Sequence, residues 1–306
     1  MKNRWQFLNG FMLKIIAIIT MAFDHIGIFL IQYAKPNYSI DDPKFWGVPM
    51  SATGYVFRCI GRLALPIFCL LFAEAMRHSK SREKYFIRLG IMAFIVFIGE
   101  VILRFTLNMQ FDGNIFITLL CAGTFIYFIE KRNNKIFFAI FPLLVIIFST
   151  SACYYESFTG GVLLWWPNFL RGQYDLYGFL LMVGSYFIYY ISDYRVLSIT
   201  HEKEQTRDIN ELRTFPYYRS FSNVLWMILI IVVTFFFWLL ARFDGRLDIY
   251  FMNVQSWAFF AAIIPLFYNG KKGYSSKKLQ YGFYLYYPLH LVLLFVIFGS
   301  IFGFGG

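Results

Sequence analysis

The sequence is poor in charged residues. Only 15% of its 306 residues are charged, whereas an average soluble domain carries about 25%. Hydrophobic residues make up 59% of the chain and aromatic residues 22%, and this balance cannot cover a domain with a water-soluble surface. It excludes a soluble enzyme that merely touches a membrane. We predict an all-α, polytopic integral membrane helix bundle that forms a single transmembrane domain over residues 1–306.

Several motifs of enzyme chemistry are also missing. The chain contains no Gly-rich phosphate loop, no cluster of metal ligands and no nucleophile elbow, so ATPase, metalloprotease and serine-hydrolase functions lack support and no metal is expected. No small-residue cleavage site follows the first apolar run, which we therefore expect to act as an uncleaved insertion signal. The four cysteines lack metal-type spacing and are interpreted as packing residues: Cys59, Cys69, Cys121 and Cys153.

Nine apolar runs are candidates for membrane crossing. A hydrocarbon core of about 30 Å takes roughly 20 residues of helix. The fifth run has only about fifteen residues, so we expect it either to be re-entrant or to extend beyond its apolar stretch. The runs cover approximately residues 11–33, 54–76, 86–106, 115–131, 136–150, 174–192, 221–241, 253–268 and 281–302.

The basic residues predict which side each loop occupies. Alternating the loops along the chain gives 18 Lys and Arg on the side of the N-terminus and 5 on the other side. The positive-inside rule therefore predicts a cytoplasmic N-terminus and an external C-terminus. This distribution explains the net charge of +11, and we expect no nucleic-acid partner. The polar segment 193–220, which contains His201, is predicted to be a solvated cytoplasmic loop with a short surface helix.

Two ionisable residues lie within the first apolar run. Asp24 and His25 are past its middle, where each such group costs on the order of 3 kcal/mol and usually faces a bundle interior or a wet cavity. One interpretation is a structural clamp between helices, in which Asp24 pairs with an arginine and His25 donates to a carbonyl. The other is a functional site. Adjacent residues differ by about 100° around a helix, so Asp24 need not hydrogen-bond His25.

The second run carries two arginines on one face. Arg58 and Arg62 are four residues apart and therefore stack one turn above the other. Asp24 and Glu100 are their candidate protein anions, and a phosphate or a developing oxyanion is the functional alternative. Pro66 frees a backbone carbonyl and is predicted to kink this helix, which would open a cavity where the arginines point.

The last run presents a histidine two residues after a proline. Pro288 loosens the backbone two residues before His290, which suits a site near the middle of the membrane. A satisfied core histidine is the alternative. Tyr287 either lines the same cavity or belongs to an interfacial aromatic belt.

Two further groups are candidates for binding a donor substrate. The segment MRHSKSREKYFIRL is densely basic, which fits either topogenic charge with anionic lipid or a docking surface for a polyanionic cytosolic donor. Asn114 and Thr118, at helical spacing, could hydrogen-bond neighbouring helices or a ligand. The full set of candidate donor-binding residues is Arg58, Arg77, His78, Lys80, Arg82, Asn114, Thr118 and Tyr287.

The ordered segments resemble one family along nearly the whole chain. The resembling residues are LKIIAIITMAFDHIG, FRCIGRLALPIFCLLFAEAMRHSKSREKYFIRL, NIFITLL, YDLYGFLLMVGSYFIYY, PLFYNGKKG and FYLYYPLHL. Together they are similar to the TraX family of membrane proteins, whose named member is linked to N-terminal acetylation of conjugative pilin. Ala75 stands where a glycine is common. The resemblance implies a multi-pass protein of a bacterial cell membrane.

The family resembles a wider group of transmembrane acyltransferases that use cytosolic acyl-CoA. The resemblance implies acetyl-CoA or another acyl-CoA as donor, and Asp24, His25, Arg62 and His290 as the polar centre. We interpret His25 as the general base and Asp24 as its orienting group or the partner of Arg62. Arg62 and His290 would stabilise the oxyanion. An acyl-histidine relay would use the same residues.

Other functions remain compatible with the same residues. The acceptor could be a peptide, a glycan or a lipid, because each offers an amine or hydroxyl to a histidine base. A secondary transporter could use the intramembrane charges as a relay, although the two halves show no inverted repeat. A non-catalytic membrane assembly factor would use Asp24 and His25 as a clamp.

Overall fold

The fold is almost entirely helical. The computed structural model describes residues 5–34, 44–45, 48–79, 81–107, 113–131, 134–163, 165–202, 213 and 216–302. Within these residues the sole sheet is an antiparallel pair of two-residue strands, β1 (Lys44–Phe45) and β2 (Val48–Pro49). The all-α prediction is confirmed.

Every predicted apolar run coincides with a helical stretch. The helix at the fifth run extends beyond the predicted range 136–150. Here η2 and α6 together make a 25-residue apolar helix from Lys135 to Thr159. The helices are α1 (Gly10–Ala34), α2 (Met50–Gly61), α3 (Ala64–His78), α4 (Arg82–Leu107), α5 (Ile115–Glu130), η2 (Asn134–Ala139), α6 (Ile140–Thr159), η3 (Asn168–Leu170), α7 (Asp175–Glu202), α9 (Pro216–Phe243), η4 (Gly245–Leu247), α10 (Met252–Gln255), η5 (Ser256–Phe267) and α11 (Lys277–Phe302).

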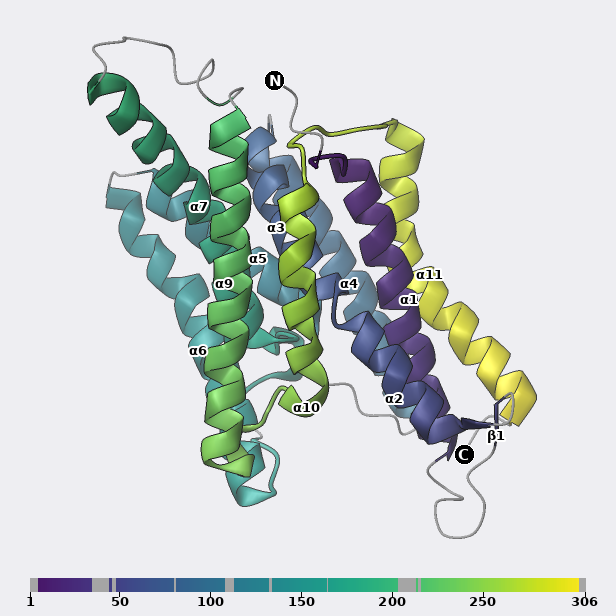
Figure 1. The fold of residues 1–306 in the computed structure, drawn as a ribbon. Helices are drawn as coiled ribbons and strands as arrows, with labels where there is room; N and C mark the ends of the chain where they lie inside the picture. Colours follow the sequence, from purple (N-terminus) through teal and green to yellow (C-terminus); the bar gives the residue numbers. More distant parts are fainter. Residues whose placement is uncertain are drawn as a thin grey trace.

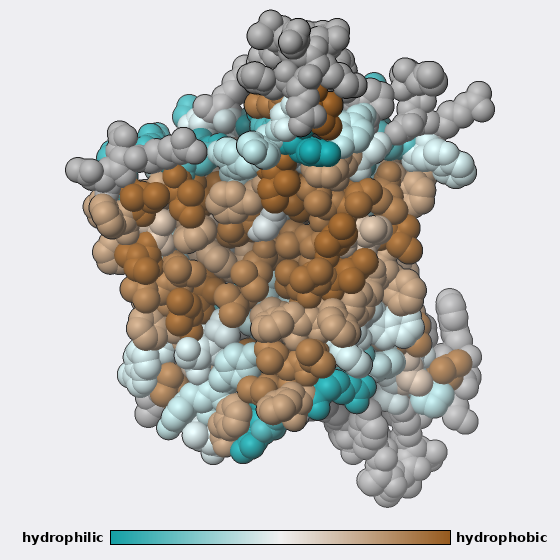
Figure 2. Space-filling view, turned by 60° about the vertical axis from the view of Figure 1, so that its left-hand side comes forward, coloured by the Kyte–Doolittle hydropathy of each residue, from teal (hydrophilic) through white to brown (hydrophobic). Residues whose placement is uncertain are grey.

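The molecule has the surface of a membrane protein. Figure 2 shows a broad hydrophobic band between two more hydrophilic ends. Six helical stretches among the described residues are long and apolar enough to cross a membrane: Gly10–Gln32, Met50–His78, Arg82–Ile102, Lys135–Thr159, Tyr217–Phe243 and Lys278–Ile301. The stretches Ile115–Glu130 and Met252–Phe267 are apolar but shorter. The polytopic bundle is thus confirmed, while the count of nine crossings stays a prediction.

The helices run side by side along one common direction (Figure 1). The start of α1 lies beside the segment that precedes α11, because Gly10 N donates to Lys271 O at 2.8 Å. We call this the α1 end of the bundle; α3 and α7 also end there, and α9 begins there. The segment 193–220 contains the end of α7, up to Glu202, and the start of α9, from Pro216. Most of the residues between these two helices, where the predicted surface helix would lie, are outside the described residues.

The core is centred on α3 and α7. Side chains of α3 such as Cys69 and Met76 are fully buried, and they pack in one cluster with Leu181 and Tyr189 of α7. All four cysteines are free, and Cys59, Cys69 and Cys121 are buried among apolar groups, as expected for packing residues.

The second predicted run is interrupted in its middle. Pro66 has no N–H to donate to the carbonyl of Arg62, four residues earlier. Accordingly α2 ends at Gly61 and α3 begins at Ala64, with Arg62 as the C-cap residue of α2. The predicted kink is confirmed.

Helices α1 and α2 pack closely through glycines. A Cβ atom on Gly27 would lie 2.6 Å from the carbonyl oxygen of Gly54, and one on Gly61 would overlap the side chain of Asp24. Only glycine permits this approach. The close contact places Asp24 of α1 directly against the end of α2, where Arg62 begins the break.

Candidate functional site

A cavity leads from the α1 end of the bundle to the polar residues in its middle. Its volume is about 580 Å³, within the usual range of about 300–1,000 Å³ for small-molecule sites. Lys14 and Lys272 line it near the α1 end, and Asp24, His25 and Arg62 line it deeper in the bundle. Residues from several helices that are far apart in the sequence therefore share one internal surface.

Asp24 and Arg62 form a buried ion pair at this surface. Their exposed fractions are 8% and 5%. Arg62 Nη2 donates to Asp24 Oδ1, and Arg58 Nε lies 3.5 Å from the same oxygen. Asp24 is thus the carboxylate that meets both arginines, one of the two candidates that the sequence offered. Breaking a buried pair by removing one partner usually costs about 3–5 kcal/mol.

Arg62 also fixes three other groups. Its Nη1 donates to Tyr174 Oη at 2.7 Å and to Gln255 Oε1 at 3.0 Å, and its Nε donates to the carbonyl of Arg58 at 3.3 Å. With Asp24, four acceptors occupy a guanidinium that has five N–H donors. The side chain therefore ties α1 to the segments around Tyr174 and Gln255.

His25 faces a different helix from its neighbour Asp24. His25 Nδ1 lies 2.7 Å from His290 Nε2, and His290 Nδ1 lies 2.7 Å from the carbonyl oxygen of Tyr286. The ring of His290 stacks on that of Tyr286 with 4.6 Å between centroids. His25 lines the cavity together with Tyr286 and Tyr287, while His290 is buried behind it.

The hydrogen-bond partners assign the tautomers of the two neutral rings. A carbonyl oxygen only accepts, so His290 Nδ1 carries the proton and His290 Nε2 has the lone pair. His25 Nδ1 must then donate to His290 Nε2. The remaining nitrogen, His25 Nε2, is left with a lone pair. A lone pair on a cavity-lining histidine is what a general base requires.

A strained turn brings Tyr174 to the site. Tyr174 has a φ of +61° and Asp175 a φ of +22°, and such conformations cost of order 1–3 kcal/mol each and cluster at functional sites. Asn114 N donates to the carbonyl of Arg171 at 2.9 Å, and Thr118 Oγ1 donates to the carbonyl of Gln173 at 2.8 Å. Asn114 and Thr118 therefore hold this turn and do not line the cavity.

The sequence analysis did not identify Tyr174 or Gln255 as site residues. Tyr174 is one of 22 tyrosines, and nothing in its local pattern separates it from an interfacial belt. Gln255 is completely buried, but it stands among other polar residues at the start of the run 253–268, beside Asn253 and Ser256, so the sequence does not single it out.

Positive side chains line the cavity toward the α1 end. They are Lys14 of α1, Arg88 of α4 and Lys272. No described carboxylate forms an ion pair with them. Glu74, an acidic side chain that also lines the cavity, accepts from Arg219 Nη1 at 3.2 Å and lies 3.6 Å from His78 Nε2.

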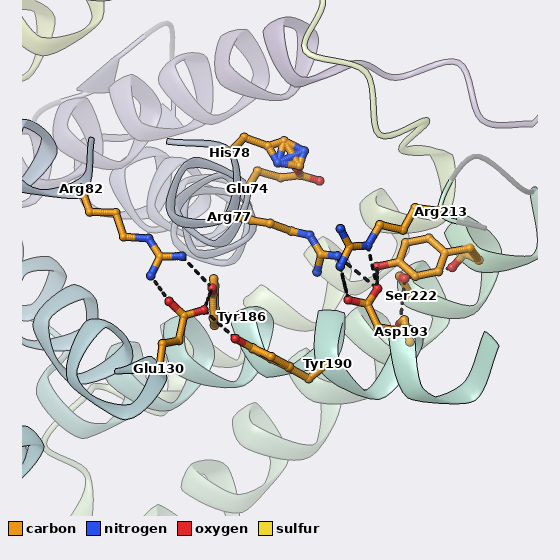
Figure 3. Close-up of polar contacts among 12 residues, drawn as sticks. Glu74, Arg77, His78, Arg82, Glu130, Tyr186, Tyr190, Asp193, Arg213 and Ser222 are labelled. Carbon is orange, nitrogen blue, oxygen red and sulfur yellow. Dashed lines mark hydrogen bonds and ion pairs between the residues drawn. The ribbon is translucent and has the colours of Figure 1, made fainter. Parts of the chain in front are cut away.

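The predicted donor-binding residues fall into separate places. His78 and Tyr287 line the cavity, Lys80 lies outside the described residues, and Arg58 reaches Asp24 without lining the cavity. Arg77 and Arg82 turn away into carboxylate networks (Figure 3). Whether any of them binds a donor stays a prediction.

The first network surrounds Asp193. Arg77 Nη2 lies 3.1 Å from both carboxylate oxygens, Arg213 Nε lies 3.0 Å from Oδ1, and Tyr218 Oη donates at 2.9 Å. Burial by itself would raise the pKa of Asp193, but the Arg213, Arg77 and Tyr218 donors outweigh it and hold this pKa below its usual range.

The second network surrounds Glu130 at the end of α5. Its carboxylate pairs with Arg82 and accepts from Tyr186, and Tyr190 Oη donates to it at 2.5 Å (Figure 3). The two networks tie α3, α4 and α5 to the stretch of α7 from Tyr186 to Asp193. They brace the α1 end of the bundle around the cavity.

Comparison with known proteins gives two matches. A family model described as the TraX protein matches residues 9–199. A curated relative, the probable fimbrial assembly protein FimC, serogroup H1, of Dichelobacter nodosus, is 31% identical over 125 residues, which cover 37% of this chain and 43% of the relative. The chain thus spans less than half the length of this relative. No solved structure matches the chain.

Proposed function

The chain belongs to the TraX family, and from this membership we propose that it is a membrane-embedded acyltransferase of the bacterial cell membrane. It moves an acetyl or other short acyl group from cytosolic acyl-CoA to an amine or hydroxyl acceptor. The observation that carries the proposal is that His25, whose Nε2 is left with a lone pair, lines a cavity that extends to the α1 end. The α1 end faces the cytoplasm, in line with its excess of basic residues.

His25 serves as the general base. It takes the proton of the acceptor as the acceptor attacks the thioester carbonyl, and the positive charge that develops is shared with His290 through the 2.7 Å hydrogen bond. His290 does not line the cavity, so its contacts support a positioning role, through its own bond to the carbonyl of Tyr286. The four bonds of Arg62 likewise favour a positioning role for that side chain.

The cavity suits a donor with a charged head and a thioester at the end of a narrow arm. Lys14, Arg88 and Lys272 would bind the phosphates of coenzyme A near the cytoplasm, because phosphates are recognised by unpaired cations. Apolar side chains such as Leu65 and Phe68 line the path inward. The thioester would then reach His25.

The comparisons favour a peptide acceptor, an amine or hydroxyl of a pilus or fimbrial subunit. The TraX family is associated with pilin acetylation, and the relative's name is that of a fimbrial assembly protein. A glycan or lipid hydroxyl would use the same base.

A non-catalytic assembly factor is the second candidate. The observation that favours it is the clamp around Arg62, which joins α1 to two distant segments of the chain. In such a protein, replacing Asp24 or His25 would lower protein abundance and leave no turnover to measure.

The test measures free CoA released from acetyl-CoA by the purified protein in detergent, with envelope extract as the acceptor source. His25→Gln is compared with His201→Gln, a histidine whose side chain we predict to be solvated. Release that needs the extract, survives in His201→Gln and is lost in folded His25→Gln supports the acyltransferase. Folded wild-type protein that neither binds acetyl-CoA nor releases CoA refutes it and favours the assembly factor.

A further inference from the structure

Tyr174 is placed at the reacting end of the cavity by an unusual backbone. It lines the same cavity as His25 and Arg62, and its φ of +61° is rare for a bulky residue. Donors from α5 hold the turn, and a Cβ on Gly172 would approach Thr118 Oγ1 to 2.5 Å. An over-determined turn that keeps a non-glycine residue in this conformation is typical of functional positions.

The phenol of Tyr174 has a proton to give. Arg62 Nη1 donates to Tyr174 Oη at 2.7 Å, and since a guanidinium is only a donor, the tyrosine oxygen accepts this bond. The hydroxyl proton remains available, because no described residue accepts it. A charge-assisted bond from a guanidinium also draws electron density from the phenol oxygen and makes its O–H a stronger donor.

Arg62 itself is already occupied. Four protein acceptors take four of its five N–H groups, which leaves little with which to bind a substrate oxygen. His25 and Tyr174 thus line one cavity and bring two complementary groups to it, a lone pair on His25 Nε2 and a hydroxyl proton on Tyr174.

We propose that the Tyr174 hydroxyl donates a hydrogen bond to the oxyanion formed during acyl transfer and that Arg62 positions and polarises it. As the acceptor's nitrogen or oxygen bonds to the thioester carbon, His25 takes the proton of that nitrogen or oxygen. The carbonyl electron pair moves onto the carbonyl oxygen, which accepts the hydrogen bond from Tyr174. When the carbonyl re-forms, the carbon–sulfur bond breaks and the CoA thiolate takes the proton from His25. The proton of Tyr174 stays on the phenol throughout.

This inference rests on the proposed acyltransferase function, and the test separates the two. CoA release from acetyl-CoA with envelope extract is compared between wild-type protein, Tyr174→Phe and the control Tyr85→Phe, which removes a hydroxyl from the same cavity on α4. Losing one oxyanion donor usually lowers kcat about 10²–10³-fold. We expect that loss in Tyr174→Phe with a KM for acetyl-CoA within about threefold of the wild type, and little change in Tyr85→Phe.

A second variant guards against misfolding of Tyr174→Phe. Incorporating 3,5-difluorotyrosine at position 174 keeps the size of the ring and its oxygen but makes the phenol more acidic. We expect this protein to stay active near neutral pH and to lose activity at a lower alkaline pH than the wild type does.

Wild-type turnover with an unchanged kcat in folded Tyr174→Phe, or an unshifted alkaline limb in the difluorotyrosine protein, overturns the role of Tyr174 and leaves the acyltransferase intact. Folded wild-type protein without turnover overturns both.

Discussion

Removing the charge of Asp24 is expected to destabilise the protein strongly, by an amount that depends on Arg62. Asp24→Asn leaves the guanidinium of Arg62 buried at 5% exposure without its anion. Such a loss costs about 3–5 kcal/mol, which corresponds to a fall in Tm on the order of 10 °C for a chain of this size. Tyr174 and Gln255 still accept from Arg62, so we expect the lower part of this range.

The dependence on Arg62 is measured by a double-mutant cycle. Thermal unfolding in detergent is followed for Asp24→Asn, Arg62→Gln and the double variant. Directly paired residues couple by about 0.5–3 kcal/mol, and burial puts this pair near the upper end, so the double variant should be clearly more stable than the sum of the two losses predicts.

An exposed pair provides the matched control. Asp244 and Arg246 lie 2.7 Å apart, with the arginine side chain 60% exposed, and Asp244→Asn should leave the Tm nearly unchanged. Strict additivity of the Asp24 and Arg62 losses would refute the clamp.

Three further predictions concern the cavity, one network and one helix contact. Lys14→Ala should raise the KM for acetyl-CoA several-fold without changing kcat, whereas Lys84→Ala, which lies outside the cavity, should not; equal effects in a CoA-release assay would contradict the assigned phosphate site. The pKa of Asp193 is depressed in the folded state, so its stabilisation is complete above its unfolded value of about 3.9 and is lost as pH falls through the folded pKa. The Tm difference between wild type and Asp193→Asn should therefore be full at pH 6 and shrink below pH ~4, and a difference independent of pH would count against the network. Gly61→Ala should lower the Tm and Gly90→Ala should not, because a Cβ overlaps another side chain only at the first position.

Hydropathy was sufficient to locate the helices, and Pro66 was sufficient to locate the break between α2 and α3. Apolar length sets where a chain can cross a bilayer, and Pro66 acts on the carbonyl four residues before it, so both are local properties. The pairing of Asp24 with Arg62 was also among the predicted alternatives, since a buried charge needs a counter-charge.

The partner of His25 could not be derived in this way. His290 lies 265 residues further along the chain, and hydropathy does not specify how two helices are rotated toward each other. For the same reason the sequence could not distinguish Arg77 and Arg82, which pair with carboxylates, from Arg88, which lines the cavity. Tyr174 depends on a turn with positive φ at a non-glycine residue, for which the sequence carries no general signal.

The hydrogen bonds of the two histidines end on the carbonyl oxygen of Tyr286. A backbone carbonyl cannot take up a proton and pass it on, so a proton that enters at His25 has no onward relay beyond His290. It must leave through the cavity by which it arrived. The histidine pair is therefore suited to holding a proton for the duration of one chemical step and returning it, and it is poorly suited to conducting protons from one face of the membrane to the other.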